Sequence, residues 1–229
     1  MISTTLDERQ YRTADEINTA MGRVYGHMGI AVLVSMIMSY MVGTSPALLE
    51  FFFTGITKWI VIFAPLVFVF LVPMLLNSGI GLVGASLVLY GFAGVMGLSF
   101  ATIFAVFKMG SIFTAFMGAA VLFGVMSIYG YFTKKSLDSV GKFMFVGLIA
   151  IVIASIINIF VGNTVVQMVI SALAIIIFLG LTAYDTQKIR EELMYESTYV
   201  AEVSGALSLY LNFINIFLSL LQLFGDKKE

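Results

Sequence analysis

The chain has no cysteine and a single histidine, His27, among its 229 residues. Without cysteine it forms no disulfide, and thiolate metal sites and thiol nucleophiles are excluded. One histidine does not build a histidine-based zinc site, and neither an HExxH nor a GxSxG motif occurs. We therefore expect a protein that is not an enzyme and holds no cofactor. For His27 itself, two interpretations remain: an interfacial histidine with a satisfied hydrogen bond, or a proton relay.

Charged residues are also scarce. They make up 11% of the chain, against 60% hydrophobic residues, a net charge of −1 and a mean hydropathy of +1.05. Soluble domains carry about 25% charged residues. No basic patch interleaved with aromatic residues suggests nucleic acid. The composition predicts a polytopic protein whose main partner is the lipid bilayer.

Seven segments approach the length of about 20 apolar residues that a membrane-spanning helix needs. They are Val24–Val42, Lys58–Leu76, Ile80–Phe107, Ile112–Phe132, Phe143–Val161, Val165–Tyr184 and Ala206–Phe224. The longest polar connection is Thr186–Val203. The prediction is an all-α membrane protein with an N-terminal tail (1–22), a seven-helix domain (23–225) and a short C-terminal tail (226–229).

Lysine and arginine are distributed unequally between the predicted connections. With the N-terminus inside, eight basic residues are cytoplasmic: Arg9, Arg12, Arg23, Lys134, Lys135, Lys142, Lys188 and Arg190. Four lie outside: Lys58, Lys108, Lys227 and Lys228. The positive-inside rule therefore predicts a cytoplasmic N-terminus. A last segment that re-enters without crossing would place the C-terminal lysines in the cytoplasm too.

The last apolar segment carries a regular stripe of polar residues. They are Ser208, Asn212, Asn215, Ser219 and Gln222, at spacings of 4, 3, 4 and 3. Such spacings place all five on one face of a helix. Unpaired amides facing hydrocarbon are costly, so this helix is predicted to be enclosed by other helices or to line a wet cavity.

Asp185 is the acidic residue joined directly to a spanning segment, at the inner end of the sixth. One interpretation is a solvated acid at a helix end, paired with Lys188 at i+3. The other is a carboxylate at a cytoplasmic gate, since ionisable groups at membrane depth are functional candidates. Asn212 lies about 12 Å along the last helix from Ser204, within reach of that carboxylate.

Three further features admit a structural and a functional interpretation. Asn158, in the fifth segment, is expected to hydrogen bond between helices. Glycines of the third segment share a face, which suits a packing seam or a hinge: Gly84, Gly91, Gly94 and Gly97. Acids of the long connection form a solvated loop or attract divalent cations weakly: Glu191, Glu192, Glu196 and Glu202.

Three stretches resemble the transmembrane Bax inhibitor motif family: FGVMSIYGYFTKKSLDSVGKF (123–143), GLTAYDTQKIR (180–190) and GALSLYLNFINIFLSLLQLFG (205–225). The resemblance implies seven helices, with the last one central and wrapped by the other six. It also implies calcium leak through a pH-sensitive gate. Eukaryotic relatives suppress cell death and lower the calcium of internal stores, and a bacterial relative restrains a membrane-bound ATP-dependent protease. The match looks bacterial, which implies the cytoplasmic (inner) membrane.

The family gate is a pair of aspartates. Asp185 matches the first, whereas Asn212 stands at the second position. Two close carboxylates share a proton and so sense pH, but an Asp–Asn pair has one titrating group. We therefore expect a calcium leak with a weak or shifted pH response.

In this prediction Asp185 offers calcium only a weak, transient site. The gate and ion path comprise Asp185, Asn212, Asn215, Ser208 and Ser219. Two alternatives stay open. One is a non-conducting regulatory protein that modulates a membrane protease or stress and cell-death signalling, and the other is a proton-coupled transporter of an organic solute.

Overall fold

A computed structural model describes residues 12–228 apart from 77 and 196–198. The described residues form α-helices and no extended strand. The helices are α1 (Ala14–Gly43), α2 (Pro46–Phe53), α3 (Thr57–Leu76), α4 (Leu82–Ser99), α5 (Thr102–Val106), α6 (Met109–Phe132), α7 (Asp138–Val161), α8 (Thr164–Tyr195) and α9 (Tyr199–Phe224). Among the described residues, seven helical segments are long and apolar enough to cross a membrane, with α4 and α5 together forming one of them. The predicted all-α class with seven spans is confirmed.

The first helix begins earlier than the apolar segment suggested. Thr13 caps α1, because its hydroxyl accepts a hydrogen bond from the Glu16 amide while the Glu16 carboxylate accepts one from the Thr13 amide. This capping box fixes the start of a helix. Residues 14–22 of the predicted tail are therefore helical, and Ile17 and Met21 are buried. The division of the chain into tails and a membrane domain stays a prediction.

The predicted long connection from Thr186 to Val203 is wrong. α8 continues to Tyr195, and α9 begins at Tyr199. Ile189 and Leu193 on this extension are buried, and their i, i+4 spacing gives it an apolar face that packs inward. Helix-forming residues and this face together outweigh the polar composition.

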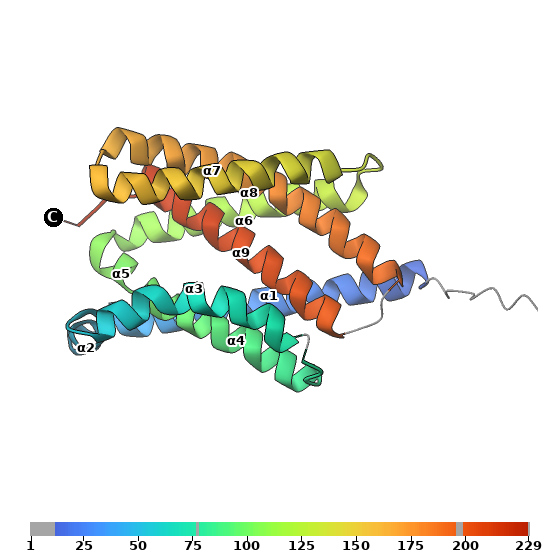
Figure 1. Ribbon diagram of the computed structural model, residues 1–229, viewed down its shortest axis with the longest axis horizontal. Helices are drawn as coiled ribbons and strands as arrows, with labels where there is room; N and C mark the ends of the chain where they lie inside the picture. Colours follow the sequence, from blue (N-terminus) through green and yellow to red (C-terminus); the bar gives the residue numbers. More distant parts are fainter. Residues whose placement is uncertain (1–11, 77, 196–198, 229) are drawn as a thin grey trace, which may run out of the picture.

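α9 runs obliquely between two groups of helices (Figure 1). It packs against α1, α3, α4, α6 and α8, whereas α7 packs chiefly against α8. The last helix is therefore enclosed on most sides, but a ring of six helices around it is not confirmed.

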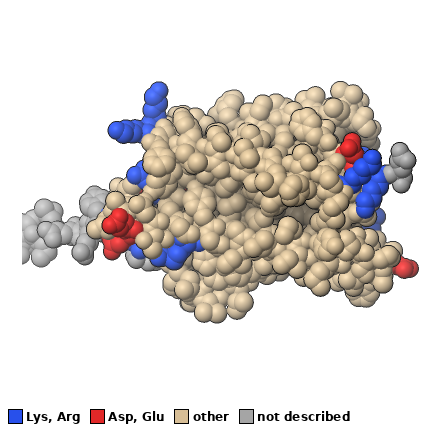
Figure 2. Space-filling model, turned by 180° about the vertical axis from the view of Figure 1, so that it is seen from behind, with Lys and Arg blue, Asp and Glu red and all other residues tan. Residues whose placement is uncertain are grey.

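The described part of the chain begins and ends at opposite ends of the helix bundle. The start of α1 lies at one end, which we call the amino end, and the C-terminus lies at the other, the carboxyl end (Figure 1). α9 thus crosses the whole bundle. On the face shown in Figure 2, charged residues gather at the two ends and leave the middle without charge. At the carboxyl end, the C-terminal tail pairs with the α5–α6 connection, because the Lys108 amide donates to the Asp226 carbonyl at 2.9 Å.

Two glycines allow helices to approach closely. A Cβ at Gly97 of α4 would stand 2.4 Å from the Ser35 carbonyl oxygen of α1, and one at Gly130 of α6 would stand 2.2 Å from the Ala183 carbonyl oxygen of α8. Any larger residue would force the backbones apart. The packing seam predicted for the third span is therefore confirmed at Gly97, whereas Gly91 has open surroundings.

A candidate gate between α8 and α9

Asp185 and Asn212 meet inside the bundle. The Asn212 Nδ2 donates a hydrogen bond to the Asp185 Oδ2 at 2.6 Å. Asn212 is 4% exposed, and Asp185 is half-buried. At about 1.5 Å per residue, Asp185 lies about 32 Å along α8 from Thr164 and Asn212 about 20 Å along α9 from Tyr199. The contact that the sequence spacing left open, and that the family resemblance implied, is therefore present.

The alternative partner of Asp185 is engaged elsewhere. Lys188 pairs with Glu192 at i+4, with 3.6 Å between Nζ and Oε1, and both side chains are about half exposed. In place of the Asp185–Lys188 pair of the first interpretation, the structure has an exposed Lys188–Glu192 pair. The carboxylate of Asp185 points instead toward the buried amide on α9.

Beyond Asn212, the polar stripe of α9 reaches a cavity that neither Asp185 nor Asn212 lines. The cavity has a volume of about 240 Å³ and lies among α7, α8 and α9. Asn215, Ser219 and Gln222 line it from α9, and Gln167 and Ser171 face them from α8. Three residues of the stripe therefore line a cavity of mixed polar and apolar surface, and that this cavity is wet stays a prediction.

Two residues of the predicted ion path, Ser208 and Asn215, differ from Asn212 in their surroundings. Ser208 is half-buried on the amino-end side of Asn212 and does not line this cavity. Asn215 lines the cavity but donates its Nδ2 hydrogen bond to the Leu211 carbonyl of its own helix at 2.8 Å. Asn212 is therefore the stripe amide that joins α9 to α8.

Two isolated polar residues have the partners expected of them. The Asn158 Nδ2 donates to the Asn163 carbonyl at 3.1 Å and to the Gln167 Oε1 at 3.2 Å, closing the α7–α8 turn. The His27 Nδ1 lies 2.7 Å from the Tyr90 hydroxyl, between α1 and α4. The interpretation of an interhelical amide is confirmed, and His27 has a hydrogen-bond partner, while the proton-relay alternative is not tested.

One ion pair, between α1 and α9, was not predicted from the sequence. Arg23 of α1 binds Glu202 of α9 through two hydrogen bonds, with Nε–Oε2 at 2.7 Å and Nη2–Oε1 at 2.5 Å. Glu202 was predicted to belong to an exposed acidic loop, which is wrong, since it is 5% exposed. Glu191 and Glu192 are exposed on α8, and Glu196 lies outside the described residues. The signal was present: Arg23 and Glu202 are opposite charges flanking the first and last apolar segments.

Comparison with known proteins agrees with this arrangement. Residues 17–229 match the family described as "Inhibitor of apoptosis-promoting Bax1". The chain is 35% identical over 222 residues to the inner membrane protein YbhL of Escherichia coli, covering 93% of each chain. It is 32% identical over 224 residues to an uncharacterized protein of Deinococcus radiodurans, covering 96% of this chain and 95% of that one.

A third relative, the uncharacterized protein YrjE of Lactococcus lactis, is 33% identical over 222 residues, covering 93% of this chain and 92% of its own. The family match includes both halves of the α8–α9 contact and all seven spans from residue 17 onward. The chain therefore belongs to the Bax inhibitor family and is an integral membrane protein.

Proposed function

We propose that this protein is a slow cation leak pathway, with calcium as the permeant ion, and that the α8–α9 contact is its gate. The observation that carries the proposal is the 2.6 Å hydrogen bond between Asp185 and Asn212, which lies about one turn of α9 from Asn215, a residue that lines a cavity with polar groups. A carboxylate at membrane depth attracts cations, and the amide that binds it joins two helices that must separate for passage. The Asp185–Asn212 hydrogen bond, which we call the latch, would thus hold α8 and α9 together, and its carboxylate would favour cations over anions.

Polar side chains extend the path toward the carboxyl end. From Asn212 to Gln222, α9 covers about 15 Å, and Gln222 is exposed. Between them, Asn215 and Ser219 face the cavity. Amide and hydroxyl oxygens replace part of an ion's water shell, so a cation that reaches this cavity is stabilised there.

The proposed calcium site at the gate is weak because it has few protein ligands. Calcium takes six to eight oxygen ligands, commonly with several carboxylates. Among the residues that the structure describes, no three His, Asp or Glu side chains come together. Calcium would be held only briefly by the Asp185 carboxylate, the side-chain oxygen of Asn212 and water. Brief binding suits an ion that passes through the protein.

The proposed orientation places the amino end in the cytoplasm. Described basic residues at that end are Arg12, Arg23, Lys134, Lys135, Lys142, Lys188 and Arg190, against Lys58, Lys108, Lys227 and Lys228 at the other. This asymmetry follows the positive-inside rule. The name of the Escherichia coli relative supports the bacterial inner membrane as the location.

Calcium uptake into dye-loaded liposomes tests the gate. Asn212→Ala removes the donor to Asp185 and should increase the flux, whereas Asp185→Asn keeps a hydrogen-bonding pair, removes the charge and should reduce calcium flux by about tenfold. Ser204→Ala is the control, because Ser204 lies on α9 outside both the Asp185–Asn212 contact and the cavity. The leak proposal fails if no form conducts above protein-free liposomes, or if Asn212→Ala and Ser204→Ala behave alike.

A second candidate function is a non-conducting regulator of another membrane protein, such as a membrane protease. The closed Asp185–Asn212 contact favours this regulatory function. So does an ordered surface at the amino end, where the Arg12 amide, just before α1, donates to the Met194 carbonyl of α8. Deleting residues 1–11, which lie outside the described part of the chain, separates the two candidates. A regulator would lose its effect on the partner, while liposome flux would stay unchanged.

A further inference from the structure

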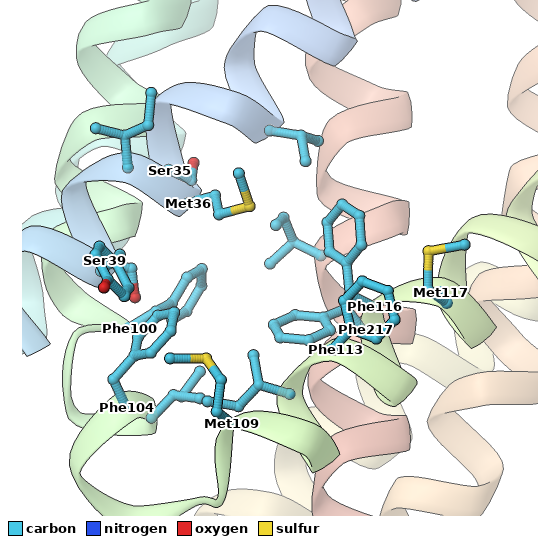
Figure 3. Close-up of a pocket in the computed structure, with 16 residues that line it drawn as sticks. Ser35, Met36, Ser39, Phe100, Phe104, Met109, Phe113, Phe116, Met117 and Phe217 are labelled. Atoms are coloured by element: carbon cyan, nitrogen blue, oxygen red, sulfur yellow. The ribbon is translucent and has the colours of Figure 1, made fainter. Parts of the chain in front are cut away.

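An apolar cavity lies on the side of α9 away from the α7–α8 pair, toward the carboxyl end. Its volume is about 400 Å³, within the range of small-molecule sites. α1, α5, α6 and α9 form its walls, which are almost entirely aliphatic, aromatic and methionine side chains (Figure 3). Of its few polar groups, the Ser35 hydroxyl is already bonded to the Ala93 carbonyl at 2.8 Å and lies 2.6 Å from the Tyr210 hydroxyl. The occupant must therefore be apolar.

The cavity opens sideways, between α1 and α6. The molecular surface is hollowed on this face, toward the carboxyl end (Figure 2). The edge is formed by side chains that are themselves exposed, including Met36 of α1 and Phe113 of α6, which is 65% exposed. Exposed apolar positions on spanning helices face hydrocarbon, so the opening leads into the bilayer and not into water.

The depth of the cavity matches one leaflet. Phe113 lies about 6 Å along α6 from Met109, and Val32 lies about 16 Å along α1 from Gly43. The hydrocarbon core is about 30 Å thick, so half of it is about 15 Å. The cavity therefore runs from the carboxyl-end boundary of the bilayer to its middle, which is the extent of an acyl chain.

Three lysines lie beside wall residues at the boundary end of the cavity, although none of them lines it. Lys108 directly precedes Met109, and Lys227 pairs with Phe107. The Lys228 Nζ donates to the carbonyl of Phe104, a wall residue, at 2.7 Å. None of the three forms an ion pair among the described residues, where the acids at the carboxyl end are Asp226 and Glu50. A phosphate at this boundary would meet net positive charge and the start of α6.

We propose that this cavity binds an acyl chain of an anionic phospholipid, with the head group held by Lys108 and Lys227. The chain would lie against Ile214 and Phe217 of α9, the helix that carries Asn212. Lipid composition would thereby act on the same helix as the latch, from its opposite side. The binding itself does not depend on whether the latch conducts.

Tryptophan quenching by brominated lipids tests the site. Trp59 is the one tryptophan of the chain, so Trp59→Phe gives a silent background for Phe113→Trp at the cavity edge. Ile157→Trp is the matched control, since Ile157 is 57% exposed on α7 and lies at a similar depth from the carboxyl end. At equal mole fraction, brominated anionic lipid should quench Phe113→Trp with a roughly tenfold preference over brominated zwitterionic lipid. The control should show no preference.

Two variants separate the head group from the chain. Lys108→Gln with Lys227→Gln should abolish most of the preference, whereas Lys58→Gln, on α3, should leave it unchanged. Equal quenching by both lipids at Phe113→Trp would overturn the proposal, and so would equal behaviour of the two tryptophan positions.

A second measurement uses the unaltered protein and does not depend on the tryptophan variants. Mass spectrometry of the protein released from mild detergent should show one retained anionic phospholipid. That lipid should be lost in Met36→Trp, whose larger side chain fills the opening. Retention of zwitterionic lipid, free fatty acid or detergent alone would count against the assignment.

Discussion

Arg23 of α1 and Glu202 of α9 are 179 residues apart in sequence and form a two-point ion pair, in which guanidinium Nε and Nη2 each meet one carboxylate oxygen. The pair fastens the first turns of α9 to α1. The latch at Asn212 fastens the same helix to α8, on a different side. α9 is thus held near its start by charge and near its middle by an amide.

We expect Glu202→Gln to lower stability by roughly 1–3 kcal/mol, because it removes a charge-assisted bond from a nearly buried carboxylate. Arg23→Gln should cost at least as much, because it leaves the nearly buried Glu202 carboxylate unpaired, whereas the Arg23 side chain is 46% exposed and can be solvated. A double-mutant cycle read by thermal unfolding in detergent measures the coupling. Glu192→Gln breaks the exposed Lys188–Glu192 pair and should cost less than about 1 kcal/mol. Additive effects of Arg23→Gln and Glu202→Gln would contradict the pairing.

Gly130→Ala should destabilise the α6–α8 contact by about 1–3 kcal/mol, because the new methyl would collide with the Ala183 carbonyl. Ala183 is two residues from Asp185, so the displacement should also weaken the latch. Gly124→Ala on the same helix meets open space and serves as the control. Thermal unfolding checks the first effect and calcium flux the second. Equal unfolding temperatures for the two variants would refute the close approach.

Asn212→Asp should create a pH-dependent latch. Where two carboxyl groups share one proton they hydrogen bond, and where both are ionised they repel. The variant should therefore leak more as pH rises between about pH 5 and pH 8, while the wild-type response stays weak. Flux measured across this range, with Ser204→Asp as control on the same helix outside the cavity, provides the comparison. A wild-type profile as steep as that of Asn212→Asp would contradict the assignment of the response to this pair.

Asn158→Leu should loosen the α7–α8 turn and cost about 1–3 kcal/mol, because it leaves the Asn163 amide and the Gln167 side chain without their partner. Hydrogen exchange at residues 162–167 should accelerate. Ser155→Ala, one turn earlier, removes only a bond within α7 and should leave exchange unchanged. Unchanged exchange in Asn158→Leu would show that the turn is held by other contacts.

The spans and the latch followed from local patterns. Apolar length located all seven membrane segments, and the 4, 3, 4, 3 spacing placed the amides of α9 on the face that meets Asp185 and the polar cavity. These predictions succeeded because a helix has a fixed rise and period, and because lipid tolerates few unpaired polar groups.

Other features depended on contacts between distant segments. The burial of Glu202 requires Arg23 beside it, and the helical extension of α8 beyond Asp185 requires a surface on which Leu193 packs. Because both segments are polar in composition, the sequence alone predicts connections between helices there. The apolar cavity likewise arises from the separation of α1 and α6, which no residue pattern within either helix records.

Seven candidate spans make an odd number, which bears on where attachments to the chain would appear. Lys228 is bound through its amide to the Val106 carbonyl at 2.8 Å, so that residue is held beside the α5–α6 connection. If all seven candidates cross, an epitope or reporter enzyme fused after Lys228 would be displayed in the compartment opposite the one that receives the start of α1. In intact cells the two termini would therefore report on different sides of the same membrane.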